Sequence, residues 1–195
     1  MDARKTGEMI RSLRREKGMT QKDLSGRLHV SVQAVSKWER GLGCPDVALL
    51  SSLARVLDVP AETLLNGRLN INPPNGGNMK RIKFYQCPLC GNLMTATGNA
   101  EISCCGRKLE PMKMKMADEM HALKITDVED EKLVSFAHPM EKGHHLTFLA
   151  AVGYDAVHVT KLYPEGASEV RMPRIPWAKY YCGCSEETAT LFLSK

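Results

Sequence analysis

The segment from Thr20 to Gly41, TQKDLSGRLHVSVQAVSKWERG, constrains the fold more than any other part of the chain. Thr20 is a favourable helix N-cap residue, and Asp23 three positions later approximates a capping box. Leu24 and Leu28 then give the first helix a buried stripe. The segment from Leu28 to Val30 suits a tight turn, and Ser31 is a second N-cap candidate. The pattern therefore predicts two short helices joined by a turn.

The second of these helices, residues 31–40, has two chemically different faces. With residues placed about 100° apart around the helix axis, one arc carries Ser31, Ala34, Val35 and Trp38. The opposite arc carries short polar and cationic side chains together with one valine, namely Val32, Gln33, Ser36, Lys37 and Arg40. One face suits a hydrophobic core, and the other suits a DNA groove. The plainer alternative is a small helical bundle with a solvated charged face.

Residues 5 to 67 resemble the helix-turn-helix domain of Cro/C1 (XRE-type) repressors. An upstream helix is predicted from Thr6 to Lys17. Downstream, Pro45 and Asp46 suit the first turn of a helix, Pro60 suits the start of a last short helix, and Gly67 suits its end. The downstream helix would carry Val47, Leu50, Leu53 and Leu57. The resemblance implies a five-helix bundle that binds operator DNA as a homodimer. Cys44 is expected to be a small packed residue.

The same resemblance, with the arc of exposed side chains, predicts the DNA contacts. Gln21 would contact a phosphate, as residues at this position do in the family. Gln33 is expected to pair with adenine, Lys37 with guanine O6 or N7, and Val32 with a thymine methyl, whereas Arg40 would hold phosphates. The full predicted DNA-binding set is Gln21, Ser31, Val32, Gln33, Ser36, Lys37 and Arg40.

The distribution of charge agrees with a basic N-terminal part. The net charge of the 195 residues is +5, and residues 1–68 carry twelve Lys and Arg against eight Asp and Glu. The remainder carries fifteen against fourteen, so most of the excess lies where phosphate contacts are expected. No apolar run reaches transmembrane length, and the N-terminus lacks the apolar core of a signal peptide. We therefore expect a cytoplasmic protein with no membrane partner.

Seven cysteines in a chain expected to be cytoplasmic favour metal or redox chemistry over disulfides. After a segment rich in Asn, Pro and Gly at residues 68–79, which predicts a linker, four of them form two close pairs. Cys87 and Cys90 are two residues apart, and Cys104 and Cys105 are adjacent, each pair followed by glycine. Such spacing lets thiolates grip one tetrahedral ion. The alternative is four reduced cysteines without metal.

This arrangement resembles desulforedoxin and the N-terminal domain of desulfoferrodoxin, in which four thiolates hold one iron. The resemblance implies iron at Cys87, Cys90, Cys104 and Cys105, and zinc fits the same ligands. Because four protein ligands leave no open coordination position, such a centre is not a catalytic site. It is expected to be structural, to transfer electrons or to respond to oxidation.

The rest of the chain, from about Pro111 to Phe192, resembles the part of desulfoferrodoxin that is related to superoxide reductase. Three motifs carry the resemblance: Glu119-Met120-His121, the H-P-M-x-x-x-H segment from His138 to His144, and the segment Tyr180 to Ser185. The family site holds iron with four imidazoles and one thiolate, in a small immunoglobulin-like sandwich. Strand-like alternation at Leu146-Phe148-Ala150 and at Ala156-His158-Thr160 suits such a sandwich.

Two departures from the family pattern bear on function. Ser185 stands where the last iron-binding histidine is expected, and a hydroxyl is a poor ligand for ferrous iron. Met120 replaces the lysine that draws superoxide toward the iron in the family. A second iron or zinc site is still predicted from His121, His138, His144 and Cys182, with Cys184 and His145 as candidates to fill the gap. The alternative is a domain that has lost its enzymatic activity and is kept for packing or dimerisation.

The sequence thus predicts a multidomain α plus β protein. Its parts are a five-helix helix-turn-helix domain (1–67), a linker (68–79), a desulforedoxin-like metal domain (80–112) and a superoxide-reductase-like β-sandwich (113–195). The function indicated is a DNA-binding transcription regulator with a metal–thiolate, redox- or metal-sensing region, and not an enzyme. Three alternatives stay open: a DNA-tethered superoxide reductase, an antitoxin-like module that binds DNA and a protein partner, and a DNA binder whose metal only staples a small domain.

Overall fold

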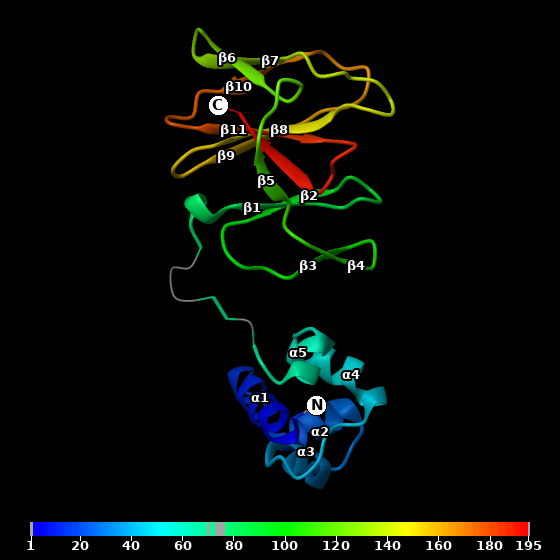
Figure 1. Cartoon of the computed structure of the whole chain (residues 1–195). Coiled ribbons are helices and arrows are strands. Elements are labelled where there is room, and N and C mark those ends of the chain that lie inside the picture. Colours follow the sequence, from blue (N-terminus) through cyan, green and yellow to red (C-terminus); the bar gives the residue numbers. More distant parts are fainter. Residues whose placement is uncertain (1, 70, 73–76, 195) are drawn as a thin grey trace. The chain divides into compact units, whose positions relative to one another are not determined.

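The computed structural model describes residues 2–69, 71–72 and 77–194, and the chain divides into two compact units, Met1–Ile71 and Asn72–Lys195 (Figure 1). Of the segment predicted as a linker, residues 70 and 73–76 lie outside the described residues. Its end enters a short 3-10 helix, Met79–Arg81. The four-cysteine region and the following strands belong to the same unit.

The first unit contains the five predicted helices. They are α1 (Ala3–Glu16), α2 (Gln21–Leu28), α3 (Val32–Glu39), α4 (Val47–Leu57) and α5 (Ala61–Asn66). The first helix begins three residues earlier than predicted, because the Asp2 side chain accepts hydrogen bonds from the backbone N–H groups of Arg4 and Lys5. Asp46 caps α4, so Pro45 precedes this helix instead of lying in its first turn.

The core of the first unit forms where α1 packs against the other helices. Ile10, Leu24, Leu53 and Leu64 are fully buried there. A glycine is required at position 7, because a methyl group there would collide with the carbonyl oxygen of Trp38 in α3. The expectation for Cys44 was wrong: this side chain is exposed. The neighbouring Pro45 takes the buried position in its place.

The described residues of the second unit form twelve strands. These are β1 (Lys83–Gln86), β2 (Leu93–Ala96), β3 (Ile102–Cys104), β4 (Arg107–Leu109), β5 (Lys113–Met116), β6 (Leu123–Val128), β7 (Glu131–Phe136), β8 (Leu146–Val152), β9 (Val157–Lys161), β10 (Glu169–Pro173), β11 (Lys179–Cys184) and β12 (Thr190–Leu193). β1–β2 and β3–β4 are separate antiparallel hairpins. The sandwich consists of a five-stranded sheet, in the order β5-β12-β11-β8-β9, and a three-stranded sheet, in the order β10-β7-β6.

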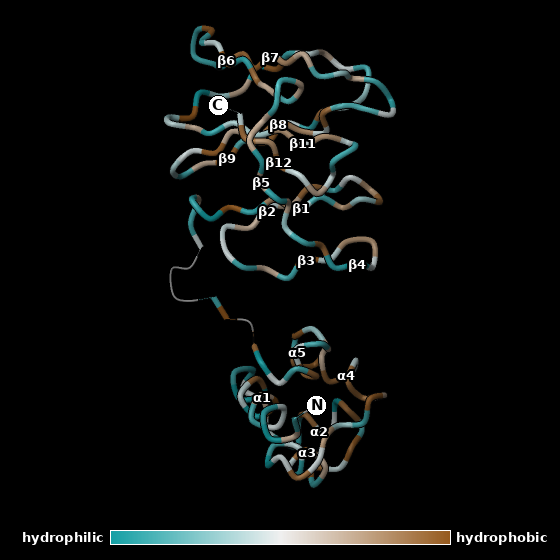
Figure 2. The backbone as a smooth tube through the Cα atoms, in the orientation of Figure 1, coloured by the Kyte–Doolittle hydropathy of each residue, from teal (hydrophilic) through white to brown (hydrophobic). Residues whose placement is uncertain are grey.

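β8 explains how the β1–β2 hairpin and the sandwich share a core. Residues 146–150 were expected to alternate, but all seven residues of β8 are buried. Leu149 packs between the two sheets, together with Val134 of β7 and Met172 of β10. Phe148 instead packs against Phe84 of β1, with their ring centroids 5.9 Å apart. Both faces of this strand are therefore covered, which accounts for the hydrophobic stretch in Figure 2.

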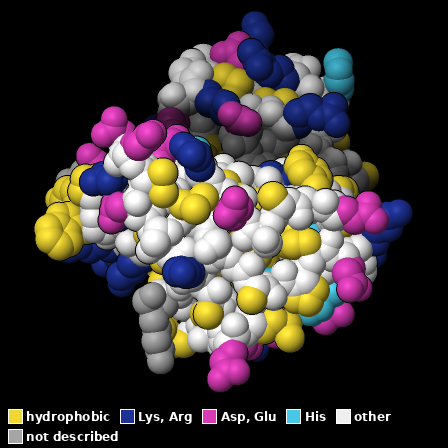
Figure 3. All heavy atoms as spheres, turned by 90° about the horizontal axis from the view of Figure 1, so that it is seen from above, with side chains coloured by type: hydrophobic (Ala, Val, Ile, Leu, Met, Phe, Trp, Pro, Cys, Tyr) yellow, Lys and Arg dark blue, Asp and Glu magenta, His cyan; other side chains and the backbone are white. Residues whose placement is uncertain are grey.

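The surface drawn in Figure 3 mixes acidic, basic and apolar side chains, and no single charge dominates that view. Among the described residues, no helix is both long enough and apolar enough to cross a membrane.

Candidate nucleic-acid interface and metal sites

The N-terminal site begins with the two caps that the sequence predicted. Thr20 Oγ1 accepts a hydrogen bond from the Asp23 N–H (3.1 Å), and the Asp23 carboxylate accepts one from the Thr20 N–H (2.8 Å). The C-cap of α2 is His29, whose φ of 53° is left-handed. Ser31 then caps α3 by accepting from the Ala34 N–H at 3.1 Å. These bonds fix where the two helices begin and end.

The outward side of α3 carries the side chains predicted for it. Val32 is 39% exposed, and Gln33, Lys37 and Arg40 are also exposed. Ser36 is half-buried. On the inward side Val35 and Trp38 are buried, with exposed fractions of 0% and 7%. The helix therefore presents a compact polar and cationic surface to its surroundings.

A buried ion pair, which sequence reasoning missed, joins α1 to the end of α3. Arg14 Nη2 donates to Glu39 Oε2 at 3.0 Å, and Arg14 Nη1 donates to the Met19 carbonyl at 2.6 Å. Burial acts to raise the pKa of Glu39, but hydrogen bonds from Arg14 and Gln21 outweigh it and lower the pKa below its usual value. No sequence pattern in the two helices indicates that Arg14 and Glu39 would meet.

Gln21 shares this ion pair. Its Nε2 donates to Glu39 Oε2 at 2.8 Å, and the residue is half-buried. The amide that was predicted to contact phosphate is thus held in place from the protein side. Its contact with DNA stays a prediction.

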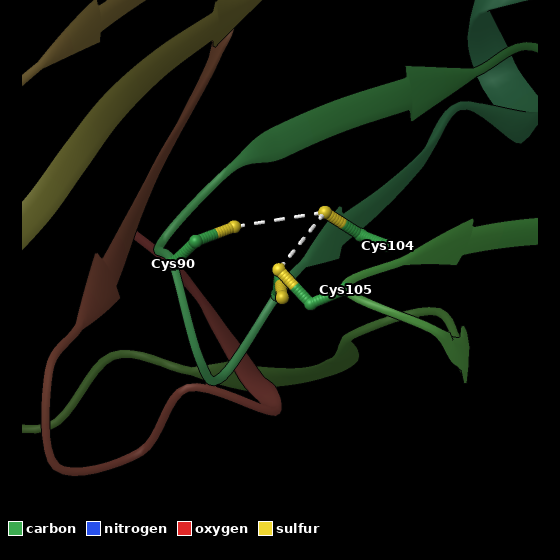
Figure 4. A group of neighbouring side chains, drawn as sticks. Cys90, Cys104 and Cys105 are labelled. Atoms are coloured by element: carbon green, nitrogen blue, oxygen red, sulfur yellow. Dashed lines mark hydrogen bonds between the residues drawn. The ribbon is translucent and has the colours of Figure 1, made fainter.

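The second unit brings the four predicted cysteines together at the ends of the two small hairpins. Their sulfur atoms all lie within 4.8 Å of one another. The measured separations are 3.6 Å for Cys90–Cys104 and 3.9 Å for Cys104–Cys105 (Figure 4). A tetrahedral ion with metal–sulfur bonds of about 2.3 Å has sulfur–sulfur edges of roughly 3.8 Å. The four thiols therefore fit such an ion.

Two tight turns produce this arrangement. Cys105 and Gly106 form the two-residue turn between β3 and β4, with φ of 50° and 72°. Positive φ at both residues is the mark of a type I′ turn, which explains the glycine. On the other hairpin, Gly91 has φ 65° and its N–H donates to the Cys87 carbonyl at 2.9 Å.

The thiols of this cluster do not ionise alike. Backbone N–H groups of Cys90 and Leu89 lower the pKa of Cys87 to about 7. Hydrogen bonding to Cys90 and Cys87 raises the pKa of Cys105 to about 12. Cys87 is buried whereas Cys90 and Cys105 are exposed, so the cluster has a closed side and an open side.

A second group of ligand atoms lies in the sandwich. The ligand atoms of His121, His138 and Cys184 lie within 4.8 Å of one another, and all three residues are buried. His121 Nδ1 lies 2.7 Å from Asp118 Oδ1, and His138 Nδ1 lies 2.6 Å from the Pro139 carbonyl oxygen. The Nε2 atoms of both imidazoles are buried without a hydrogen-bond partner among the described residues. Metal-binding histidines are held in this way by their second nitrogen.

Other residues predicted for this site take different places. Cys182 is buried, but its Sγ lies 3.6 Å from the His121 carbonyl oxygen, and burial raises its pKa to about 12. His144 lies beside His138, with ring centroids 4.5 Å apart, and its Nε2 is 3.8 Å from Glu186 Oε2. The pairing of β11 with β8 shifts register between Gly183 and Cys184, and such a bulge redirects a side chain.

Ser185, which stands at the place of the family's last histidine, forms hydrogen bonds with the loop before β8. Its Oγ accepts from the His145 N–H at 3.0 Å and donates to the Gly143 carbonyl at 3.3 Å. Met120 is 47% exposed. Two imidazoles and one thiol therefore converge in this structure, with a third imidazole at the edge, so the described residues do not reproduce a ring of four imidazoles.

Comparisons with known proteins divide along the same two units. A family model described as Helix-turn-helix matches residues 10–64. The chain is 36% identical over 81 residues to the HTH-type transcriptional activator BcrR of Enterococcus faecalis, covering 40% of this chain and 40% of that protein. It is 30% identical over 91 residues to a desulfoferrodoxin homolog of Archaeoglobus fulgidus, covering 43% of this chain and 73% of that protein.

The fold of the superoxide reductase from Treponema pallidum is similar. Its structure aligns with a TM-score of 0.51 and 17% identity, covering 58% of this chain and 97% of that one. At this identity the likeness concerns the fold alone.

Proposed function

Because the chain belongs to the desulfoferrodoxin family and carries an N-terminal XRE-type helix-turn-helix domain, we propose that it is a transcription regulator whose metal–thiolate region controls operator binding. The observation that carries this proposal is the joining of two features in one chain. These are an outward-facing polar helix, α3, and a four-thiol cluster with spacing suited to a tetrahedral ion.

α3 would lie in the major groove. Gln33 offers an amide for bidentate contact with adenine, Lys37 a cation for guanine, and Val32 an apolar surface for a thymine methyl. Arg40, at the C-cap of α3, would hold phosphates, and Gln21 would do so from the start of α2. The Glu39 carboxylate supports this arrangement because it anchors both Arg14 and the Gln21 amide.

Operator recognition would require two copies of the chain. Recognition helices of this class read half-sites about 34 Å apart, one turn of the duplex, and therefore act as dimers. We propose that the second unit supplies the dimer contact. A change in its metal centre would then alter the distance between two copies of α3.

The four cysteines would hold iron or zinc, and that ion would keep the two hairpins together and stabilise the thiolates. Cys90 and Cys105 are exposed, so an oxidant can reach their sulfurs. Oxidation or loss of the ion would release the two hairpins from each other. We propose that this change lowers operator affinity.

The histidine–cysteine group of the sandwich would hold a second ion through His121, His138 and Cys184. All three residues are at most 5% exposed, so the proposed ligands are shielded from solvent. Met120 supplies no cation near it. These features support a structural role for the second ion and count against a superoxide reductase. A rapid-mixing superoxide assay on iron-loaded protein tests this directly: turnover at family-like rates would establish the enzyme.

The central experiment compares operator affinity in three states of the same protein. An operator is first selected from random DNA by anaerobic, metal-loaded protein. Fluorescence anisotropy then gives the Kd for metal-loaded, peroxide-treated and chelator-treated samples. A Cys44→Ser background removes the exposed thiol of the DNA-binding unit, so that a response reports the cluster alone. Affinity is expected to fall in the second and third states. Equal affinities would leave the metal with an architectural role only.

A further inference from the structure

One lysine of the sandwich contacts the backbone beside the four-cysteine centre. Lys161, at the end of β9, donates from Nζ to the Gly91 carbonyl oxygen at 2.5 Å, across 70 residues of sequence. Gly91 directly follows Cys90, and its N–H is already bonded to the Cys87 carbonyl. The lysine therefore holds the outer end of the turn that presents both cysteines of the first hairpin.

The charge of Lys161 is not used elsewhere. Among the described residues, no carboxylate lies within ion-pair distance of it, and the Gly91 carbonyl is its one hydrogen-bond acceptor. A divalent ion with four thiolates has a net formal charge of about −2, so a nearby cation stabilises the loaded centre. Among the described residues, the one side-chain N–H within hydrogen-bond distance of these sulfurs is that of Asn92, whose Nδ2 is 3.8 Å from Cys104 Sγ.

A hollow of about 500 Å³ lies on this side of the cluster. Its walls are formed by Cys90, Gly91, Asn92, Leu93, Thr95, Val159 and Lys161. Lys161 and Cys90 thus line the same hollow, and Cys90 is exposed. The ammonium acts on the centre through the Gly91 peptide group and across this space.

We propose that Lys161 is a positioning residue of the four-cysteine centre. It holds the Gly91 carbonyl and offsets the negative charge of the thiolates, and in this way it retains the ion and favours the more reduced, more negative state. The inference rests on the proposed function to the extent that the four cysteines hold a metal. It adds that the sandwich, through one side chain, sets how easily that metal is lost or oxidised.

The test uses full-length protein with three substitutions at one position. Lys161→Arg keeps the charge, Lys161→Gln keeps a hydrogen-bond donor without charge, and Lys161→Met removes both. Lys179→Met is the matched control, because Lys179 is exposed on β11 and has no ion pair or side-chain hydrogen bond among the described residues. The readouts are zinc transfer to a chromophoric chelator, and the visible spectrum and midpoint potential of the iron-loaded protein.

Lys161→Met is expected to release zinc about tenfold faster or more, as is usual when a group that supports a metal ligand is lost. Its midpoint potential should move to a more negative value. Lys161→Arg should stay near the wild type, and Lys161→Gln should fall between, with a difference from wild type that shrinks at high salt. Lys179→Met should match the wild type in every readout.

Equal release rates and potentials for Lys161→Met and wild type would overturn the inference while leaving the proposed function intact. Wild-type protein without stoichiometric metal at the cysteines would overturn both. A third outcome would overturn the proposed function alone. In it, the Lys161 variants change zinc release and midpoint potential as expected, but operator affinity is the same with and without metal or oxidant.

Discussion

Arg14 and Glu39 form a buried ion pair that fastens the end of α3 to α1, with side chains only 9% and 3% exposed. Because α3 carries the proposed base contacts, its orientation depends on this pair. Glu39 also holds the Gln21 amide, so one carboxylate organises both helices of the helix-turn-helix.

Removing one partner of this pair should destabilise the first unit strongly. Arg14→Met leaves the Glu39 carboxylate buried without its cation, and the free energy of unfolding should fall by about 3–5 kcal/mol. Urea unfolding followed by circular dichroism at 222 nm measures the loss. Lys17→Met, which removes an exposed ion pair with Asp58, should cost less than about 1 kcal/mol. A similar small loss in Arg14→Met would contradict the role given to the buried pair.

The same pair predicts a pH dependence. Since the folded pKa of Glu39 is lowered, its contribution is fully present above the unfolded value of about 4.3. It is lost as pH falls through the lower, folded pKa. The first unit should therefore lose stability in acid, below about pH 4.3. In Glu39→Gln this part of the acid loss should be absent, although the variant is less stable at neutral pH. Parallel curves for the two proteins would argue against the ion pair as its source.

The exposed face of α3 predicts two different DNA-binding phenotypes. Gln33→Ala should lose about 1–3 kcal/mol of discrimination at one operator position. Arg40→Ala should weaken binding to operator and to random DNA by similar factors, and should reduce the salt dependence of binding. Anisotropy titrations on single-base operator variants at several salt concentrations distinguish them. Unchanged base preference in Gln33→Ala would mean that another face of the helix meets the bases.

The two cysteines of β11 should differ in their effect on metal content. Cys184→Ala removes a group that lies with His121 and His138, so the protein should lose the second ion and keep the first. Cys182→Ala should keep both, because its sulfur faces the His121 carbonyl. Metal analysis of protein purified without added chelator measures the stoichiometry. Loss of the second ion in Cys182→Ala, but not in Cys184→Ala, would show that Cys182 is the ligand, as the sequence motif predicted.

Gly183 separates these cysteines for a steric reason. A methyl group at this position would collide with the Phe148 ring in the core that joins the β1–β2 hairpin to the sandwich. Gly183→Ala should therefore destabilise the second unit by about 1–3 kcal/mol. Thermal unfolding measures the change. Gly143→Ala is the control, since an added methyl meets nothing within 4 Å there, and it should change stability little.

The local parts of this molecule followed from local sequence signals. The caps at Thr20 and Ser31 depend on residues three positions apart, and each of the two cysteine pairs lies within a few positions of the sequence. The five-helix bundle and the β-rich second unit were both confirmed. The glycine after the vicinal cysteines likewise reflects a turn closed by neighbouring residues.

Contacts between distant segments could not be derived in the same way. Arg14 with Glu39 and Lys161 with Gly91 depend on how elements pack, which periodicity does not encode. The place of Cys184 depends on a bulge in β11, and a one-residue shift in a strand has no signature in a C-x-C segment. The full burial of β8 escaped the alternation pattern because the β1–β2 hairpin packs against its second face.

The β3–β4 hairpin closes with only Cys105 and Gly106. An inserted amino acid in that loop would swing the Cys105 sulfur away from its three companions, so the hairpin tip tolerates no change in length. The length of the tip therefore fixes where the Cys105 sulfur lies relative to that of Cys104.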